Sequence, residues 1–304
     1  MQQTGNENTA LPEESALVMY SGGLDSTVAT IQMALRFQRV VLLTIDYPFT
    51  FGLHKSPRNI KKLKAAFPDC SISHRIIDGN MIRKRIWSGF CRDYYVYCKG
   101  GAASIICMGC KIAMTVEAMI LCLEEGIGHI SNGMTRSQVA HPHCMPRVVN
   151  RFADFMAEFS IIYINDVYEI PLREDEEAIL NKYGLDQGLC IGASSVTHQA
   201  RCFLGPYKKL WLAGNPALEN DMVEYFDSKR PVMREVLSSY AEGKEEIQGN
   251  PAFRTVMDES YHGEHTHEFG PVIDKIISRS LTPVWFISKL ILWLGMKRGD
   301  THSD

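Results

Sequence analysis

Short apolar runs alternate with longer helix-like segments along the first two thirds of the chain, and this alternation restricts the fold more than any other feature. The predicted strands are residues 16–20, 40–46, 71–77, 129–134 and 160–165. The helical patterns start near Ser26, Pro57, Cys110, Arg147 and Glu174. Strands separated by helices form parallel sheets that are covered on both faces. The sequence therefore predicts an α/β fold with a doubly wound parallel sheet.

The pattern becomes irregular after Gly205, which predicts three parts of unequal size. Residues 1–15 are expected to be a flexible N-terminal tail, 16–205 the α/β domain, and 206–304 a mainly helical or irregular C-terminal extension. A chain of 304 residues with 45% hydrophobic content can bury one large core and carry such an appendage.

The chain shows no sign of a membrane segment. Its N-terminus lacks the basic region and apolar core of a secretory signal, so we expect a cytoplasmic protein. The apolar stretch 281–295 is interrupted by Lys289 and is shorter than the roughly 20 residues that span a bilayer. An amphipathic helix packed on the domain is the better interpretation of that stretch.

One stretch of the chain is strongly basic, although the net charge is only −3. Between His54 and Arg92 there are ten Lys or Arg residues and two acidic ones. Such a patch can follow a nucleic-acid phosphate backbone, or it can be the solvated faces of two helices. Both interpretations remain open on the sequence.

Residues 21–27, Ser-Gly-Gly-Leu-Asp-Ser-Thr, connect the first predicted strand to the first helix. A loop in this position offers backbone N–H groups and a helix N-terminus to anionic oxygens, and its two glycines allow close approach. The hydroxyls of Ser21, Ser26 and Thr27 add donors. Asp25 would repel phosphate unless it caps the helix or binds Mg²⁺. The alternative is a Gly-Gly turn in which Asp25 or Ser26 is the N-cap.

Two familiar phosphate motifs are missing, because the chain has neither GxxxxGK[ST] nor GxGxxG at this loop. The loop instead resembles the SGGxDS signature of the PP-loop ATP pyrophosphatases. The residues that match it are Ser21, Gly22, Gly23, Leu24, Asp25 and Ser26. The likeness covers roughly residues 16–205 and implies a Rossmann-like fold of the adenine nucleotide alpha hydrolase type.

The resemblance to PP-loop enzymes also implies a reaction and further site residues. In that family ATP is cleaved between its α and β phosphates, the substrate oxygen is adenylated, and a nucleophile displaces AMP. The loop would hold the pyrophosphate end of ATP together with Mg²⁺. The end of the second strand, around Thr44 to Asp46, would lie near adenine or ribose, and Gly133 matches the family's glycine beside the nucleotide.

The nine cysteines are an odd number, and in a reducing compartment they are not expected to form a disulfide framework. Cys107 and Cys110 form a CxxC pair that precedes a predicted helix. A helix N-terminus lowers the pKa of thiols, which suits a metal ligand or a sulfur nucleophile. Cys190 and Cys202 lie downstream, where the carboxyl edge of the sheet is expected to return to the nucleotide.

A CxxC pair with a distant third cysteine resembles the iron–sulfur branch of PP-loop sulfurtransferases, which includes tRNA 2-thiouridine and 2-thiocytidine synthetases. The resemblance implies a [4Fe–4S] cluster on Cys107, Cys110 and Cys202, with Cys190 as the reserve third ligand. Asp25 and these three cysteines would be the catalytic residues. The open iron would present sulfide to the adenylated carbon.

The sequence thus predicts an ATP-dependent sulfurtransferase, with a tRNA base as the preferred acceptor and a small cofactor precursor as the alternative. The sulfur donor is not specified, and neither is the choice between monomer and homodimer. Zinc on Cys107 and Cys110, with His or Cys partners, is an alternative to iron. His141, His143 and Cys144 belong either near such a metal or to a loop at the substrate entrance.

Two further functions stay open. Residues 131–159 and 167–184 resemble 7-cyano-7-deazaguanine synthases, PP-loop enzymes that insert nitrogen derived from ammonia. Those enzymes bind structural zinc through four closely spaced cysteines, whereas this chain has only Cys190 and Cys202 in the equivalent region. The non-enzymatic alternative is a nucleotide-binding module in which a cluster senses redox state.

Overall fold

The computed structural model describes most of the chain up to residue 241. The described residues are 14–47, 50–51, 59–97, 102–185, 190–191, 194–195, 201–202 and 216–241. They belong to one compact unit, residues 1–261, whereas the second unit, residues 262–304, falls outside them. The expected tail up to residue 13 and the expected helix at 281–295 also lie outside the described residues.

Five parallel strands form the main sheet, in the order β4-β2-β1-β5-β6. Their bounds are Ser15–Met19 for β1, Arg39–Asp46 for β2, Ser71–Asp78 for β4, His129–Asn132 for β5 and Ile162–Ile164 for β6. β1 is central and fully buried, because Val and Leu side chains on both faces pack under helices. All five predicted strands and the α/β class are confirmed.

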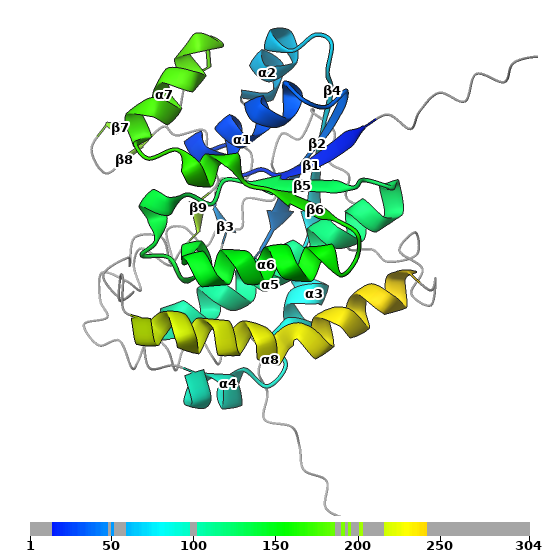
Figure 1. Cartoon of the computed structure of the whole chain (residues 1–304), viewed down its shortest axis with the longest axis vertical. Coiled ribbons are helices and arrows are strands. Elements are labelled where there is room, and N and C mark those ends of the chain that lie inside the picture. The colour runs from blue at the N-terminus through cyan, green and yellow to red at the C-terminus, as the bar shows by residue number, and fades with distance from the viewer. Residues whose placement is uncertain are drawn as a thin grey trace, which may run out of the picture. The chain divides into compact units, whose positions relative to one another are not determined.

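Helices cover the sheet on both faces, as the apolar runs of its strands require (Figure 1). On one face lie α1 (Leu24–Ala34), α2 (Ile60–Ala66) and α7 (Arg173–Lys182), which share one apolar core with alternate residues of β1 and β2. On the other face lie α3 (Asn80–Ile86), α5 (Ala102–Glu125) and α6 (Pro146–Ala157). The short α4 (Phe90–Tyr97) lies between α3 and α5 in the chain.

Short 3₁₀ turns and strand pairs complete the described part of the chain. The turns are η3 (Arg136–Gln138), η4 (Pro142–Cys144) and η5 (Asp166–Glu169). The antiparallel pairs are β3 (Thr50–Phe51) with β9 (Arg201–Cys202) and β7 (Cys190–Ile191) with β8 (Ser194–Ser195). The β3–β9 pair brings a segment around residue 201 back beside the end of β2.

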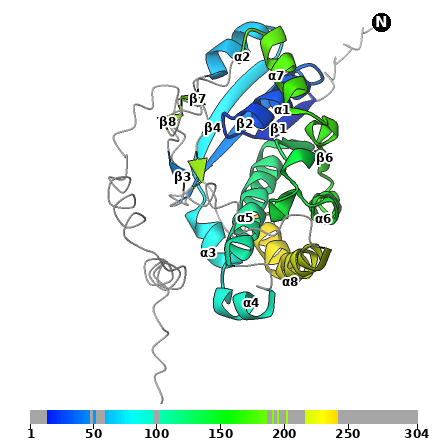
Figure 2. The same cartoon turned by 90° about the vertical axis from the view of Figure 1, so that its left-hand side faces the viewer.

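α8 (Pro216–Ala241) was not expected as a distinct helix within the extension. It packs against α5, α6 and α4, and Figure 2 shows it beside these helices on the far side of α5 from the sheet. Met222, Phe226 and Met233 are fully buried along one of its faces. The expected extension therefore contributes a helix to the same compact unit as the sheet. The boundaries at residues 15 and 205 remain predictions.

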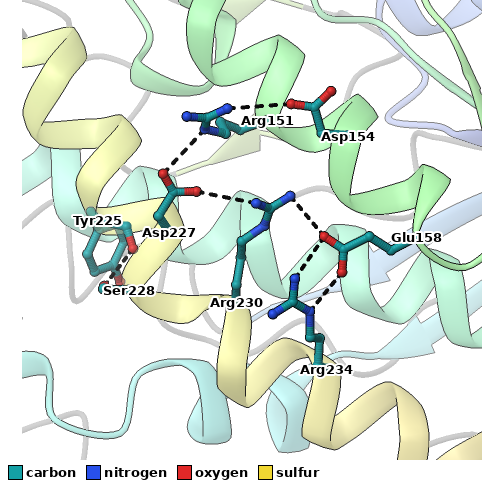
Figure 3. Close-up of polar contacts among 8 residues, drawn as sticks. All are labelled: Arg151, Asp154, Glu158, Tyr225, Asp227, Ser228, Arg230 and Arg234. Atoms are coloured by element: carbon teal, nitrogen blue, oxygen red, sulfur yellow. Dashed lines mark hydrogen bonds and ion pairs between the residues drawn. The ribbon is translucent and has the colours of Figure 1, made fainter.

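Charged side chains join α8 to α6 along their exposed edge (Figure 3). Glu158 accepts hydrogen bonds from Arg234 at 2.7 and 3.0 Å and pairs with Arg230 at 3.0 Å. Asp227 pairs with Arg151 at 3.3 Å and with Arg230 at 3.8 Å. The network adds ion pairs between α8 and the end of α6 to the apolar packing of α8.

Glu158 gives the docking of α8 a defined pH dependence. The Arg234 guanidinium, and then Arg230, lowers the pKa of Glu158 below its ordinary value of 4.5. A carboxyl whose pKa is lowered by folding stabilises the protein above its unfolded pKa and ceases to do so as the pH falls through its folded pKa. We expect a small loss of unfolding free energy below pH 4.5 in denaturant titrations. Glu158→Gln should remove that part of the acid dependence, and an unchanged acid profile would contradict the assignment.

α5 is long and apolar enough to cross a membrane by length and composition, over Ser104–Glu125. However, 78% of its most apolar window is buried inside the protein. Its apolar surface is satisfied by the sheet and by neighbouring helices, as in the core helix of a folded domain. This apolar segment of α5 is longer than the apolar stretch 281–295 that the sequence analysis singled out.

Candidate functional site

The strand order fixes where a ligand can bind. The chain moves outward in one direction from β1 through β2 to β4, and in the other direction from β5 to β6. At such a reversal the loops after the two central strands diverge and leave a crevice at the carboxyl edge of the sheet. Here that edge of the sheet carries the loop after β1, residues 20–23, and the loop after β5, which starts at Gly133.

The loop after β1 is folded by its own hydroxyl groups. Ser26 Oγ lies 3.2 Å from the backbone N of Ser21 and 3.1 Å from Ser21 Oγ. Gly22 has φ +78°, a left-handed conformation that favours glycine. Gly23, not Asp25 or Ser26, is the N-cap of α1, and no side chain caps this helix.

The loop residues therefore divide into two groups. Thr27 is fully buried and donates its hydroxyl to the carbonyl of Gly23 at 2.7 Å, so it holds the loop and does not face outward. Leu24 is buried as well. Ser21 and Asp25 are the partly exposed side chains, beside the first N–H groups of α1, which have no acceptor within the helix. This arrangement suits phosphate oxygens.

Gly133 lies directly against the loop. A Cβ at this position would be 2.6 Å from the backbone N of Ser26 and 2.8 Å from the carbonyl carbon of Asp25. Both atoms belong to the backbone, which cannot give way as a flexible side chain can. The resemblance placed Gly133 beside the nucleotide, and the geometry shows a glycine required for contact between the loops after β1 and β5.

Replacing Gly133 by Ala should displace the loop. Because the added methyl group overlaps backbone atoms, we expect a loss of about 1–3 kcal/mol of unfolding free energy and weaker Mg²⁺·ATP binding. Denaturant titration and calorimetry measure the two effects. Gly128→Ala is the matched control, since a Cβ at Gly128 meets nothing within 4 Å. Equal behaviour of the two variants would contradict the close contact.

Asp25 is held by residues from distant parts of the chain. Its Oδ2 accepts a hydrogen bond from Nε2 of Gln138 at 2.7 Å, and its carboxyl is also hydrogen-bonded to Glu176 of α7. Asp46, the other expected nucleotide contact, ends β2 and lies opposite Asp78 of β4. Its backbone carbonyl accepts a hydrogen bond from Gly79 at 3.1 Å.

The cysteines of the CxxC pair lie inside α5. The helix starts at Ala102, so the expectation that Cys107 and Cys110 precede a helix was wrong. Over residues 104–122 every side chain is buried except those of Cys107, Cys110, Lys111 and Met114. Spacings of three and four residues place these side chains on one face of the helix. The two thiols and the lysine thus form a half-buried stripe on an otherwise buried helix.

The expected lowering of the thiol pKa values is also wrong. Because Cys107 and Cys110 lie beyond the first turn, they gain little from the helix dipole. Burial, followed by the neighbouring thiol of Cys202, raises the pKa of both. Burial lowers the pKa of Lys111 to about 8, against the opposing effect of the thiols of Cys144 and Cys107. In the ligand-free chain these thiols are therefore protonated.

Cys202 interacts electrostatically with both members of the pair, so three of the expected ligands share one region. It lies in β9, opposite Thr50, and its side chain is exposed. Cys190, the reserve ligand, lies in β7. Within the described ranges, no three Cys, His, Asp or Glu side chains are grouped to hold a metal ion.

His143 reaches the same stripe from η4. Its Nδ1 lies 3.3 Å from Sγ of Cys107. Burial, followed by the positive charge of Lys111, lowers the pKa of His143 well below its ordinary value, so the imidazole is neutral. Cys144, which follows it, is fully buried and interacts electrostatically with Lys111 and Asp25. The η4 turn therefore connects the cysteine stripe with the loop after β1.

The described residues of the basic stretch do not form one continuous surface, and Lys55 and Arg58 lie outside them. The described ones are divided among α2, β4, α3 and α4, and Figure 1 shows α2 and α4 at opposite ends of the described part. Arg75 forms an ion pair with Glu125, Arg85 pairs with Glu235 at 3.0 Å, and Arg83 is buried. This arrangement favours the interpretation as separate helix faces.

Sequence reasoning missed Gln138 and Glu176. Gln138 follows Gly133 by five residues, so its place in the loop after β5 was an available signal. Glu176 belongs to the acidic run Arg-Glu-Asp-Glu-Glu at the start of α7, which has the pattern of a solvated face. No local signal distinguishes its buried position.

A phosphate-binding loop of this sequence, set at the strand reversal of a parallel sheet, is that of the PP-loop ATP pyrophosphatases, and the chain is an enzyme of this class. Residues 15–172, just over half of the chain, match the family model described as "Queuosine biosynthesis protein QueC". The chain therefore belongs to the QueC family, which is the family of 7-cyano-7-deazaguanine synthase.

Solved structures of low identity are similar to the chain. The U34-tRNA thiolase NcsA from Methanococcus maripaludis, with its [4Fe–4S] cluster, is 11% identical over 77% of this chain and 75% of its own, with a TM-score of 0.40. A 4-thiouridine synthetase in complex with RNA and ATP is 14% identical over 74% of this chain and 54% of its own, with a TM-score of 0.40. A predicted subunit of a tRNA methyltransferase from Methanocaldococcus jannaschii is 16% identical over 54% of this chain and 75% of its own, with a TM-score of 0.35. No curated protein sequence matches the chain.

Proposed function

We propose that the chain is an ATP-dependent sulfurtransferase that adenylates an acceptor and replaces the activated oxygen by sulfur, with a tRNA base as the acceptor. The observation that supports sulfur is the half-buried stripe of Cys107, Cys110 and Lys111 on α5. Cys107 and Cys110 are turned to the same face as Lys111, and Cys202 interacts with both thiols. A site for ammonia would need no such group of thiols.

The donor set fits a [4Fe–4S] cluster better than it fits a single ion. Thiolates are the ligands that iron–sulfur clusters prefer, and each binds a different iron, so they stand further apart than ligands of one metal ion. Cys107, Cys110 and Cys202 would hold the cluster, and Cys190 is the reserve for Cys202. When bound, the cluster would supply sulfide at the iron that has no protein ligand.

The remaining steps follow from the chain's own residues. The loop after β1 and the N-terminus of α1 bind the β and γ phosphates of ATP and orient pyrophosphate as the leaving group, with Mg²⁺ as counterion. The acceptor oxygen attacks the α phosphorus, so the α–β anhydride breaks and an acceptor–AMP bond forms. Sulfide then attacks the adenylated carbon, a carbon–sulfur bond forms, and AMP leaves with the former acceptor oxygen.

Lys111 lies between the thiols of the α5 stripe and the end of β1, where the phosphate loop begins. Its ammonium interacts electrostatically with Cys107 and Cys144, and its Nζ lies 3.9 Å from Sδ of Met19 at the end of β1. A cation at this point would stabilise negative charge on the attacking sulfur and on the departing phosphate. We assign it the role of electrostatic stabiliser for the second step.

Nitrogen insertion is the second candidate, because residues 15–172 match the QueC family model. In that reaction ammonia, not sulfide, displaces AMP, and the loop after β1 has the same role. The match ends before Cys190 and Cys202, so it does not extend to the third thiol. The binding of ATP is common to both candidates, and the nucleophile separates them.

Product analysis tests the proposal. Anaerobically purified protein is incubated with Mg²⁺·ATP and either unmodified tRNA with sulfide or the carboxylate precursor of 7-cyano-7-deazaguanine with ammonium. We expect pyrophosphate release and a thiolated nucleoside, detected by mass spectrometry, in the first reaction. Formation of the nitrile in the second reaction, with no thiolated nucleoside in the first, would show that the nitrogen-inserting function is correct.

A further inference from the structure

The outer sides of α3 and α4 carry basic and large apolar side chains that no step of the reaction above uses. Spacings of three and four residues place these side chains together on each helix. We name this surface the α3–α4 face, and its exposed or half-buried residues are Met81, Lys84, Arg85, Arg92, Tyr95 and Val96. A Cβ at Gly89 would lie 3.6 Å from Nη2 of Arg92, so the Arg92 guanidinium lies over the connector between the two helices.

The α3–α4 face has a net positive charge. Asp93 is the one acidic residue between residues 81 and 96, and it is 1% exposed and paired with Lys229. Arg92 lies 3.4 Å from the same carboxylate, so two cations share one anion and a positive charge remains at Arg92. Lys84 is exposed and forms no ion pair with a described residue, whereas Arg85 pairs with Glu235 at 3.0 Å. Such a surface attracts polyanions.

Tyr95 gives the face an aromatic ring that is open to solvent. Its side chain is 91% exposed, although large apolar side chains are normally at least partly covered. The helix that presents it is anchored from below, because the ring of Phe90 stacks on Trp87 with the ring centroids 5.6 Å apart. An exposed ring beside cations is the arrangement on which unpaired bases stack while the backbone phosphates meet the positive charges.

The inner side of α3 lies against the proposed sulfur site. Gly109 separates Cys107 from Cys110, and a Cβ at Gly109 would be 2.5 Å from Nε1 of Trp87, which directly follows α3. The guanidinium of Arg83 lies over the Trp87 ring at 5.1 Å. The outer and inner sides of one helix are about 10–12 Å apart. A nucleic acid bound to the outer side therefore has to pass only one helix to bring a nucleotide to the thiols.

We infer that the α3–α4 face binds RNA, with Lys84 and Arg92 at backbone phosphates and the Tyr95 ring stacked on an unpaired base. The inference rests on the tRNA acceptor of the proposed function and adds the surface on which that acceptor docks. An anionic membrane would also attract the cations. However, insertion requires a helix with a continuous apolar side, and Arg92 lies on the same side of α4 as Tyr95 and Val96.

The test compares the affinity of variants for unmodified tRNA. Fluorescence anisotropy measures binding to the anaerobically purified full chain at several salt concentrations, without ATP. Arg92→Gln and Lys84→Gln each remove one charge, Tyr95→Ala removes the ring, and Tyr95→Phe retains it. Lys61→Gln is the matched control, because Lys61 is an exposed residue of α2, at the opposite end of the described part from α4 (Figure 1).

We expect Arg92→Gln and Lys84→Gln each to reduce the slope of log affinity against log salt concentration by about 1, the effect of losing one phosphate contact. Tyr95→Ala should weaken binding about 5- to 100-fold, the loss of one stacked base, and leave the salt slope unchanged because stacking releases no counterion. Tyr95→Phe keeps the stacking ring and should bind within about twofold of the wild type. Lys61→Gln should not change the salt slope.

A Tyr95→Ala variant that binds tRNA as the wild type does would overturn the inference. Equal losses in Lys61→Gln and Arg92→Gln would also overturn it, since they would show a diffuse attraction without a defined surface. Vesicles of phosphatidylcholine and phosphatidylserine test the membrane, and binding to them that depends on Tyr95, without binding of tRNA, would overturn the inference as well. Thermal unfolding of each variant shows that a loss of binding is not a loss of fold.

The same measurements separate this inference from the proposed function. A wild-type chain that binds no tRNA would overturn the tRNA acceptor and the inference together. A chain that binds tRNA through Tyr95 and Arg92 but forms no thiolated nucleoside would overturn the sulfur transfer alone. Thiolation of tRNA by the wild type, with normal tRNA binding in all α3–α4 variants, would overturn this inference alone.

Discussion

Asp25→Ala is expected to lower the rate of pyrophosphate release by about 100- to 1,000-fold, the loss typical of removing one preorganised electrostatic group from an active site. Asp25 is the partly exposed acid of the phosphate loop, and its carboxylate accepts a hydrogen bond from Gln138 at 2.7 Å. In the proposed reaction, the substitution would remove a protein contact of Mg²⁺ at the leaving pyrophosphate.

The measurement is pyrophosphate release from Mg²⁺·ATP with unmodified tRNA and sulfide. The iron content of Asp25→Ala should equal that of the wild type, because the loop and the cysteines serve separate halves of the reaction. Asp154→Ala, which removes an exposed acid of α6, is the control and should keep full activity. Loss of iron and of turnover together would show that the variant is misfolded, and full turnover would contradict the role of Asp25.

Lys229→Met is expected to reduce the free energy of unfolding by about 3–5 kcal/mol, the cost of leaving a buried charge without its partner. Lys229 of α8 forms an ion pair with Asp93 of α4, and the two side chains are 4% and 1% exposed. Nζ of Lys229 also lies 3.3 Å from the carbonyl of Ser88. The ion pair therefore joins α8 to α4 inside the protein.

Denaturant titration measures the effect, and a double variant separates its causes. Lys229→Met with Asp93→Leu removes both charges and should recover most of the lost stability, since an apolar pair can replace a buried ion pair at little cost. Arg230→Met, the neighbouring residue in the exposed network, should lose much less. A Lys229→Met variant as stable as the wild type would contradict the buried pairing of α4 with α8.

The two central strands of the prediction, β1 and β2, could be located from the sequence because each contains a short apolar run next to polar residues. β1 was expected at 16–20 and lies at Ser15–Met19, and β2 was expected at 40–46 and lies at Arg39–Asp46. The start of α5 could not be predicted in this way. Ile, Cys and Gly around residues 105–110 have modest helix propensities, and burial against the sheet and α8 overrides them.

α8 could not be predicted from the sequence either, because its own helix propensity is weak and its contacts form only in the folded chain. It contains Pro231, and its many charged residues form ion pairs with α6 that only the folded chain shows. A helix of this kind is stabilised by tertiary packing more than by its own propensity.

The site was predictable where its residues are contiguous. The loop after β1 carries its own signature, and Gly133 lies at the end of the fourth predicted strand of the same sheet. Gln138 and Glu176 lie far from Asp25 in the sequence and contact it only because β5 and α7 return to the same edge. Cys202 likewise reaches the α5 stripe only through the pairing of β9 with β3.

In the proposed function, three thiols on and near α5 hold an iron–sulfur cluster that serves an ATP pyrophosphatase. Iron and sulfide analysis of anaerobically purified protein tests it most directly, on the wild type and on Cys107→Ala, Cys110→Ala, Cys190→Ala and Cys202→Ala. We expect a brown protein with about four iron and four sulfide per chain. Iron should be lost in the Cys107, Cys110 and Cys202 variants and retained in Cys190→Ala. A colourless protein that contains zinc, or one that keeps its iron without Cys107, would contradict the account.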